Sequence, residues 1–291
     1  MATNGHRSDS ADIDSDHPHH ELCKRAFASL VVDSVGLTQP DFRVLDMGTG
    51  DGYWLHDLRS RLRYPDEADL LGTDTTIMPA EQRPFAIPHN MRFLAQEPTD
   101  SWPEDIHGYF DLVHNRRVLA FSGGSFERAA EITARLLRLV KPGGTILLVD
   151  CCLEPGPMAS HDTPSHKLFT MLGNALSSQG IEGNLGGDLP AILDVASQVS
   201  GVRLADVGLK KSESRIGEGA DGDMRDLGMA WLEHLKGVKS KSRSKADLDR
   251  MDRLVDEVIE EARTTGFNIT WYAACAKRSG GDAGGAIEMP A

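Results

Sequence analysis

The sequence is short of cysteine and of long apolar runs, and each shortage excludes a class of protein. Its four cysteines show no CxxC or zinc-type spacing, so we expect reduced residues packed in the core rather than disulfides or metal ligands. No apolar run approaches the length that crosses a bilayer, and residues 1–16 lack the positive flank and apolar centre of a signal peptide. We therefore expect a soluble, cytoplasmic protein with no membrane partner.

Basic residues are also scarce. The chain has 31 Lys and Arg against 44 Asp and Glu, and its formal net charge of −13 repels a phosphate backbone. We therefore expect no nucleic-acid partner. The basic, serine-rich run at 236–245 (KGVKSKSRSK) has two interpretations: a solvated loop, which we favour, or a nuclear address, which leaves the nucleus as a second location.

A glycine-rich turn is the most informative segment that is present. An apolar strand at 43–47, which contains Asp46, leads into the segment Gly48-Thr49-Gly50-Asp51-Gly52 and then into an expected helix. Glycines let the backbone approach a ligand closely, and the start of a helix offers unpaired N–H groups. The GxGxG spacing after an aspartate resembles motif I of class I S-adenosylmethionine (SAM) methyltransferases. The resemblance implies SAM as cofactor and a part in binding it for these residues: Asp46, Gly48, Thr49, Gly50 and Gly52.

The next segments follow the order of that family. A strand at 68–74 ends in Asp74, about twenty residues after the turn, which is the offset of a carboxylate that binds ribose hydroxyls; Thr75 follows it. A strand is also expected at 91–94. By the resemblance, the residues after that strand meet the adenine edge: Gln96, Glu97 and Pro98.

The remaining strands complete the family pattern. The segment 109–114 resembles the fourth strand, whose end brings His114 and Asn115 to the cofactor, and 139–149 resembles the LKPGG turn and fifth strand. The sixth and seventh strands are expected at 202–209 and 267–276. The resemblance implies an α/β, Rossmann-like class I methyltransferase fold with seven strands, mostly parallel, and an antiparallel last strand.

A finer resemblance lies in three short stretches. The series GTGDGYW at 48–54, Trp102-Pro103, and FDLVHNR at 110–116 is similar to LaeA-like methyltransferases of fungal secondary metabolism. The chain departs from that pattern at Asp51, where threonine is frequent, and at Ser101, where proline is usual.

Composition and periodicity suggest one domain. We expect a methyltransferase domain at 19–278 between a disordered tail at 1–18 and a flexible tail at 279–291. A helical cap over the substrate is expected at 152–201, after the fifth strand. Apolar spacing predicts further amphipathic helices at three places: 22–35, 126–140 and 248–262.

Four side chains are candidates for the acceptor side of the reaction. His114, at the end of the fourth strand, is the first candidate for a general base, and His166 in the cap is the second. The alternative for His114 is a hydrogen bond to the backbone or packing on the cofactor. Arg116 suits an acceptor carboxylate or a neighbouring acid, and Trp231 suits either a flat apolar substrate or the core.

We expect no metal. His17, His19 and His20 form a cluster without a nearby cysteine, and we interpret it as solvated or as a helix edge rather than as a ligand set. His161, Asp162 and His166 offer similarly weak spacing, and a surface or cap-packing role is favoured.

These observations predict a SAM-dependent methyltransferase that acts on a small-molecule acceptor. The LaeA-like resemblance favours O-methylation of a secondary metabolite. Two alternatives stay open: a regulatory protein of the same fold that acts through a protein partner, and an enzyme that retains SAM while it cyclises or isomerises its substrate. A homodimer is also compatible with the sequence.

Overall fold

The computed structural model describes residues 17–30, 35–121, 125–152, 162–178, 185–236 and 245–280. Several predicted features lie outside these ranges: most of the two tails, His161, residues 237–244 of the basic run, and parts of the segment expected to form the cap.

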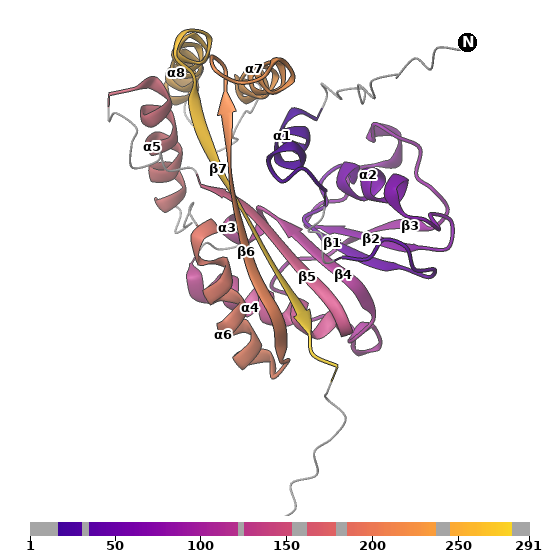
Figure 1. Ribbon diagram of the computed structural model, residues 1–291. Coiled ribbons are helices and arrows are strands. Elements are labelled where there is room, and N and C mark those ends of the chain that lie inside the picture. Colours follow the sequence, from indigo (N-terminus) through magenta and orange to yellow (C-terminus); the bar gives the residue numbers. More distant parts are fainter. Residues whose placement is uncertain are drawn as a thin grey trace, which may run out of the picture.

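A single seven-stranded sheet organises the described residues, with strand order β3-β2-β1-β4-β5-β7-β6 (Figure 1). Strands β1 to β5 run parallel, whereas β7 runs antiparallel to both β5 and β6. The prediction of a class I methyltransferase sheet with an antiparallel last strand is thus confirmed. The strands span Arg43–Met47 (β1), Asp69–Asp74 (β2), Met91–Ala95 (β3), Phe110–Arg116 (β4), Val140–Cys152 (β5), Leu204–Ile216 (β6) and Phe267–Arg278 (β7).

The central strands carry apolar side chains on both sides because both faces of the sheet are buried. Val44 belongs to the core on one face, and the next residue, Leu45, belongs to the core on the other. Leu147 and Leu148 of β5 divide in the same way. Successive strand side chains point to opposite faces, so a parallel strand covered on both sides needs a continuous apolar run.

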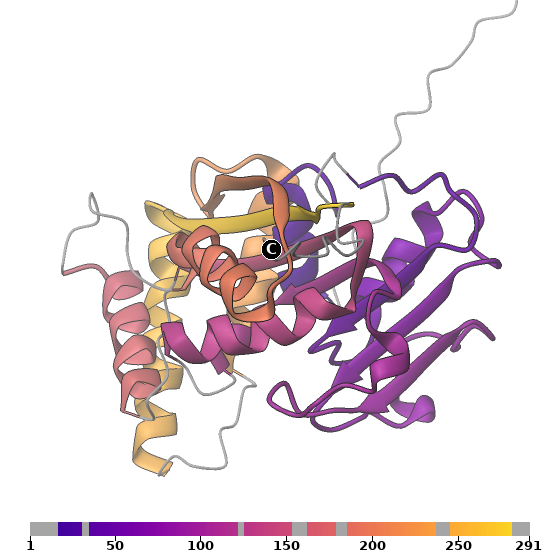
Figure 2. The ribbon, with the colours of Figure 1, turned by 90° about the horizontal axis from the view of Figure 1, so that it is seen from below.

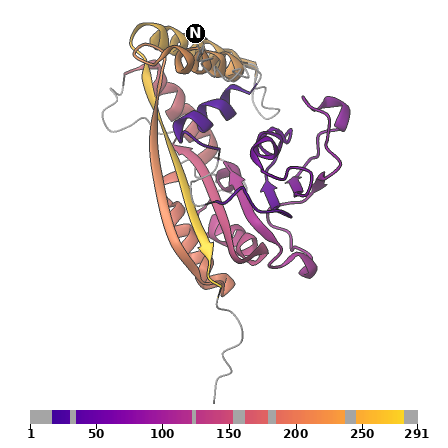
Figure 3. The same ribbon diagram turned by 45° about the vertical axis from the view of Figure 1, so that its right-hand side comes forward.

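The longer helices form two groups. On one face, α4 packs against α6 beneath the sheet, and Figure 2 shows the two side by side. Near the upper end of β5 and β7 in Figure 1, α1, α5, α7 and α8 gather, and Figure 3 shows α1 below α7 and α8. The helices span Pro18–Ala26 (α1), Tyr53–Arg61 (α2), Val118–Phe121 (α3), Phe126–Leu139 (α4), Pro164–Ser177 (α5), Leu189–Ser200 (α6), Gly222–Lys236 (α7) and Lys245–Thr264 (α8).

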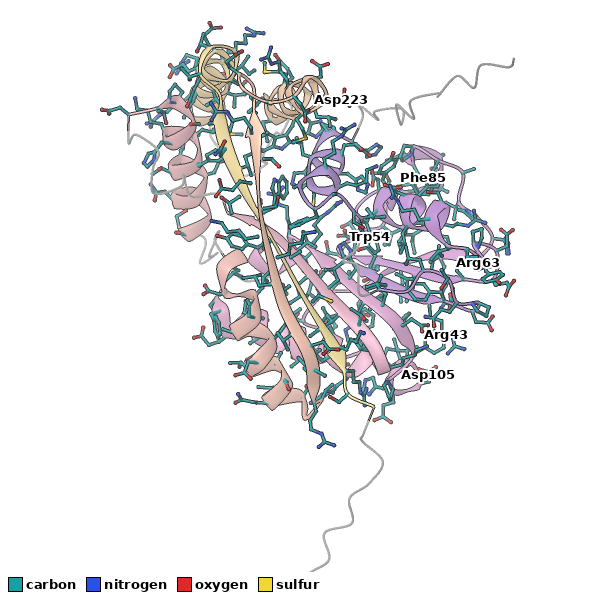
Figure 4. All side chains as sticks on the ribbon, in the orientation of Figure 1. Arg43, Trp54, Arg63, Phe85, Asp105 and Asp223 are labelled. Carbon is teal, nitrogen blue, oxygen red and sulfur yellow. The ribbon has the colours of Figure 1, made fainter. Side chains whose placement is uncertain are left out.

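Helices α7 and α8 lie between β6 and β7 in the sequence and join the N-terminal helix to the rest of the fold. α1 contacts α7, and Arg25 forms an ion pair of 3.2 Å with Asp223, which is labelled in Figure 4. α5 is fixed to α8 because the Glu261 carboxylate accepts hydrogen bonds from the backbone N–H and hydroxyl of Ser165. Of the helices in the segment expected to form a cap, α5 thus belongs to this upper group, whereas α6 packs on α4.

Three predicted elements differ in extent from the observed ones. The helix expected at 22–35 begins at Pro18 and ends at Ala26, because proline fits the first helical position and Ala28 then turns at φ 54°. The turn expected at 141–144 lies within β5, where Gly143 has φ 80° and the β4–β5 register shifts. The sixth strand begins at Leu204 and continues to Ile216 because it pairs along the full length of β7.

Two expectations drawn from absences can be compared with the described residues. Cys23, Cys151 and Cys275 are buried, as predicted for packing residues. Within the described ranges, none of the helices combines the length and apolar character needed to cross a membrane.

Candidate functional site

The glycine turn between β1 and α2 takes a conformation that depends on its glycines. Gly48, Gly50 and Gly52 have φ of 76°, 56° and 85°, a region that residues with a side chain rarely adopt. A Cβ atom on Gly48 would lie 1.8 Å from Val118 Cγ2. The backbone N–H groups of Gly48 and Thr49 both donate to the Thr73 carbonyl, at 2.7 and 2.9 Å. The turn is therefore held against the end of β2.

Asp74 closes this arrangement at the end of β2. Its Oδ2 accepts from the Gly50 N–H at 2.9 Å, and its Oδ1 accepts from the Thr75 N–H at 2.8 Å. Each carboxylate oxygen can accept a further hydrogen bond, so the group can bind a ligand while it fixes the turn.

A cavity of about 830 Å³ opens over this turn. That volume suits a small-molecule site. Nine of the predicted site residues lie on its wall: Gly48, Thr49, Gly50, Asp74, Thr75, Gln96, Glu97, Pro98 and Arg116. The wall also contains residues that the sequence analysis did not assign to a site: His19, Met47, Asp51, Thr99, Arg117, Val118 and Arg128.

Asp46, His114 and Asn115 lie behind the wall. The carboxylate of Asp46 accepts from His114 Nδ1 at 2.7 Å, and both side chains are buried. The His114 ring also stacks on Trp54 with a centroid distance of 3.7 Å, and Figure 4 labels Trp54 near the centre of the molecule. Asn115 Nδ2 donates to the Met47 carbonyl at 3.2 Å. These contacts join β1 to β4 beneath the glycine turn.

The position of His114 bears on its predicted role as a base. The imidazole is 1% exposed, and burial lowers its pKa despite the hydrogen bond to Asp46. It borders a second, very small cavity of about 20 Å³, whose lining includes Cys23 and Lys24 of α1. Its described contacts are those of a residue that stabilises the β1–β4 junction, and proton transfer by His114 stays a prediction.

The other predicted residues lie away from the wall. Gly52 begins α2, where an added Cβ would lie 2.5 Å from the Phe93 ring. His166 lies on α5, and its backbone N–H donates to Thr163 Oγ1 at 3.3 Å. Trp231 lies on α7 and is 8% exposed within the core. The described contacts of these three residues are structural.

Histidines at the start of α1 lie at or next to the cavity. His17 Nε2 lies 2.8 Å from Asp51 Oδ2, and the His17 ring stacks on Tyr53. His19 is on the wall itself, and His20 is buried just behind it. Of the two interpretations of this cluster, the helix edge is confirmed, because His17 caps α1 and His19 and His20 lie on it, whereas the solvated one is wrong for His20, which is buried. A proline that can begin a helix, Pro18, is the sequence signal that could have placed these residues on an ordered element.

Two of these histidines contact the arginines at the end of β4, Arg116 within the strand and Arg117 just after it. Arg117 NH1 lies 3.0 Å from His19 Nε2, and Arg116 NH1 lies 3.2 Å from His20 Nδ1. A guanidinium has only donors, so each of these imidazole nitrogens is an acceptor without a proton. Burial, followed by the charges of Arg117 and Arg116, holds the pKa of His19 well below its usual value. Arg117 also has φ 65°, an unfavourable conformation for a residue with a side chain.

A buried carboxylate lies at the end of β5 near these arginines. Asp150 is 4% exposed and accepts from the Cys151 N–H at 2.8 Å. Burial raises its pKa to about 6, although the positive charge of Arg117 acts in the opposite direction.

His20, Glu21 and Asp57 place ligand atoms close enough for a metal ion. The ammonium group of Lys24, however, forms ion pairs with both Glu21 and Asp57. A cationic side chain therefore already balances this acidic pair.

No protein-family model matches the chain. Among curated proteins, it is 32% identical over 232 residues to the N-methyltransferase sirN of Leptosphaeria maculans, covering 79% of this chain and 76% of that protein. It is 41% identical over 131 residues to the N-methyltransferase tcpN of Claviceps purpurea, covering 44% of this chain and 45% of that protein. It is 35% identical over 151 residues to the N-methyltransferase gliN of Aspergillus fumigatus, covering 51% of this chain and 48% of that protein.

Solved structures agree with the fold. The cyclopropane synthase MmaA2 of Mycobacterium tuberculosis superposes with a TM-score of 0.53 at 14% identity, covering 92% of this chain and 87% of that one. A phosphoethanolamine N-methyltransferase 2 of Haemonchus contortus in complex with SAM gives a TM-score of 0.51 at 13% identity, covering 93% of this chain and 59% of that one. At such identities the likeness concerns the fold alone.

Proposed function

This chain belongs to the class I SAM-dependent methyltransferases, as a relative of sirN, and we propose that it methylates a nitrogen atom of a small secondary metabolite. The observation that carries the nitrogen assignment is the alignment with sirN, an N-methyltransferase, over 79% of the chain. The shorter alignments with tcpN and gliN, which are also N-methyltransferases, support it. The acceptor proposed here is nitrogen rather than the oxygen expected from the sequence, because sirN, tcpN and gliN are all N-methyltransferases.

The residues on the cavity wall fit SAM. Asp74 carries a carboxylate that can accept from both ribose hydroxyls while its backbone neighbours hold it in place. Gly50 has no atom within 4 Å of an added Cβ, which leaves room for the methionine end of the cofactor beside the turn. Gln96 and Glu97, at the far side of the wall, suit the adenine edge. Asp46 supports the cofactor indirectly, by stabilising the glycine turn, since its side chain is hydrogen-bonded to His114 behind that turn.

The bound cofactor supplies a methyl group on a positively charged sulfur. The chain has to hold the acceptor nitrogen in line with that methyl group, with its lone pair unprotonated and water excluded. An amine beside Arg116 and Arg117 has a lowered pKa, because a nearby positive charge disfavours the ammonium form. Methyl transfer to such a neutral amine can therefore proceed without a dedicated base, and the methylated nitrogen then releases its proton to solvent.

The finer parts of the sequence interpretation belong to the same proposal. The LaeA-like stretches support a role in secondary metabolism, and a small molecule is the proposed partner. The absence of a membrane-spanning helix in the described ranges is compatible with the cytoplasm as its location.

The test is methyl transfer from isotopically labelled SAM to a panel of acceptors in matched pairs, in which each amine or amide has an oxygen analogue of the same shape. We expect labelled product from the nitrogen members, with the methyl position read from its carbon chemical shift. Methylation confined to the oxygen members would contradict the nitrogen assignment. SAM binding with an isomerised, unmethylated product, or with no turnover and a stable protein partner, would favour the two alternatives.

A further inference from the structure

Arg116, at the end of β4, lines the cavity, and its side chain is held by hydrogen bonds to buried residues of α1. NH1 of its guanidinium donates to His20 Nδ1 at 3.2 Å, and the Cys23 thiol is a second partner. Both partners are uncharged. Burial raises the pKa of Cys23, so the thiol keeps its proton.

His20 is itself held in one tautomer. Its Nε2 lies 2.9 Å from Asp57 Oδ2, and a carboxylate accepts, so Nε2 carries the proton and Nδ1 is left to accept from Arg116. His20 is 3% exposed, and its burial and the positive charge of Arg116 lower its pKa. The carboxylate, the imidazole and the guanidinium therefore form a chain in which each group has one available arrangement.

Asp57 is in turn fixed on α2. Besides His20, it accepts from Arg61 Nε at 3.0 Å and from Lys24 Nζ at 3.1 Å. Burial alone would raise its pKa, but these hydrogen bonds lower it, so the carboxylate stays ionised. Its charge is balanced by Lys24 and Arg61.

The use of an imidazole here has an electrostatic consequence. A carboxylate in the place of His20 would orient Arg116 and also cancel its charge, whereas a neutral imidazole orients it and leaves the charge in place. Asp51 is a carboxylate on the same wall, and the positive charge of Arg116 helps to lower its pKa, but its hydrogen bonds go to the Tyr53 N–H through Oδ1 and to His17 through Oδ2. Arg116 is thus a preorganised positive group beside the glycine turn.

We propose that Arg116 binds a carboxylate group in the cavity, with His20 and Asp57 as positioning residues that act through it. This inference rests on the proposed function, because the cavity is taken to hold SAM and the acceptor. Two sources can supply the carboxylate: the amino-acid end of the cofactor, which lies beside the glycine turn in that function, or an acidic acceptor.

Calorimetry with S-adenosylhomocysteine (SAH) and with decarboxylated SAH separates the two sources. If the cofactor supplies the carboxylate, Arg116→Met weakens SAH binding about 10- to 100-fold and leaves the decarboxylated compound unchanged. If the acceptor supplies it, the variant binds each compound as tightly as the wild type does. Titration of SAH-saturated protein with benzoate, followed by NMR, then shows a site in the wild type that Arg116→Met removes. Unchanged binding of all three probes would overturn the proposal.

Arg128→Met is the matched control, because Arg128 is an arginine of the same wall whose described side-chain partner is Glu131. It should leave the difference between SAH and decarboxylated SAH unaltered. An equal loss in Arg128→Met and Arg116→Met would indicate a general effect of charge and contradict a specific site. These probes need no acceptor nitrogen, so the result is independent of the nitrogen assignment.

Two substitutions of His20 test the positioning role without touching the cavity wall. An asparagine oxygen can take the place of Nδ1 and accept from Arg116, whereas a glutamine amide can take the place of Nε2 and donate to Asp57. We expect His20→Gln to weaken binding of the carboxylate probe about three- to tenfold and His20→Asn to weaken it less. The reverse order, or no loss in either folded variant, would contradict the positioning role. Thermal unfolding of both variants excludes a folding defect as the cause.

Discussion

The cofactor wall of the cavity, formed by residues 48–51, 74–75 and 96–99, differs in construction from the α1 wall, formed by His19, Arg116 and Arg117. The cofactor wall is held by backbone groups, such as the Gly48 N–H on the Thr73 carbonyl at 2.7 Å. The α1 wall is held by side chains whose partners lie 96 and 98 positions apart in the sequence. A ligand can therefore meet a wall built from local geometry on one side and a wall assembled from distant segments on the other.

This difference determines which wall a substitution can damage. Backbone contacts survive most changes of side chain but depend on glycine wherever φ is positive. Side-chain contacts between distant segments depend on each partner and on the docking of α1. The following predictions test this contrast, beginning with a buried residue behind the glycine turn.

The largest effect is expected for His114→Phe. His114 bonds Asp46 behind the glycine turn and lies beside Cys23 and Phe27 beneath α1. Phenylalanine keeps an aromatic ring on Trp54 but leaves a buried carboxylate without this donor. We expect the free energy of unfolding, measured with urea, to fall by about 3–5 kcal/mol.

His114→Asn serves as the comparison, because its amide can still donate to Asp46. We expect a smaller loss of stability and retained methyl transfer with an unaltered pH profile. A folded His114→Asn protein that has lost turnover would instead favour the general base predicted from the sequence.

The next effect concerns the cofactor wall. Gly48→Ala combines a positive φ with a Cβ position 1.8 Å from Val118, so we expect a loss of about 2–4 kcal/mol in the free energy of unfolding without ligand. Gly50→Ala shares the positive φ but has nothing within 4 Å, and we expect about 1–2 kcal/mol. Equal losses in urea unfolding would show that close packing against α3 is unimportant for the turn.

Asp74→Ala should weaken SAM and SAH binding about 10- to 150-fold, because it removes hydrogen bonds to a charged group. Titration calorimetry measures the change. Asp66→Ala is the control, since Asp66 is 76% exposed and pairs with Arg59 away from the cavity. Unchanged affinity in Asp74→Ala would contradict the predicted ribose contact.

The smallest effect is a change in how the stability of the protein depends on pH, and it concerns His19 of the α1 wall. The pKa of His19 is lowered in the folded state, so below about pH 6.5 the unfolded chain takes up a proton that the folded chain does not. Stability is therefore lost as the pH falls from about 6.5 towards the folded pKa. His19→Gln can still accept from Arg117 but does not titrate.

The free energy of unfolding of His19→Gln should fall less steeply with decreasing pH than that of the wild type, with a difference in slope of up to about 1.4 kcal/mol per pH unit. His20 and His114, whose pKa values are also lowered, contribute equally to both proteins. Parallel stability curves between pH 7 and 5 would contradict the neutral state of His19.

The contrast between the walls also explains what could be predicted from the sequence. The glycine turn and Asp74 were predictable because each depends on short, local spacing. The seven-stranded sheet with its antiparallel last strand was predictable only through the family resemblance. The α1 wall was not, because nothing near His19 or His20 in the sequence indicates Arg117 or Arg116 as a partner. Spacing alone gave no sign that α1 would begin at Pro18 and reach the glycine turn.

His114 shows a different limit. Its residue type and its place at the end of a strand are typical of catalytic histidines. The sequence does not show whether a ring at such a position faces the cavity or the core. In the structure, the stacking on Trp54 and the bond to Asp46 hold it in the core.

The position of β7 has a consequence for how the chain is completed during synthesis. β7 lies between β5 and β6, although it leaves the ribosome after both of them. A nascent chain that ends before Phe267 contains the whole glycine turn but leaves one edge of β5 open to pairing with another chain. α1 contacts β6 and α7, so this set of contacts is complete only after the segment through Lys236 has been synthesised. α1 is therefore among the last of the described helices to settle, and a ribosome-bound intermediate leaves the α1 wall incomplete and accessible to chaperones.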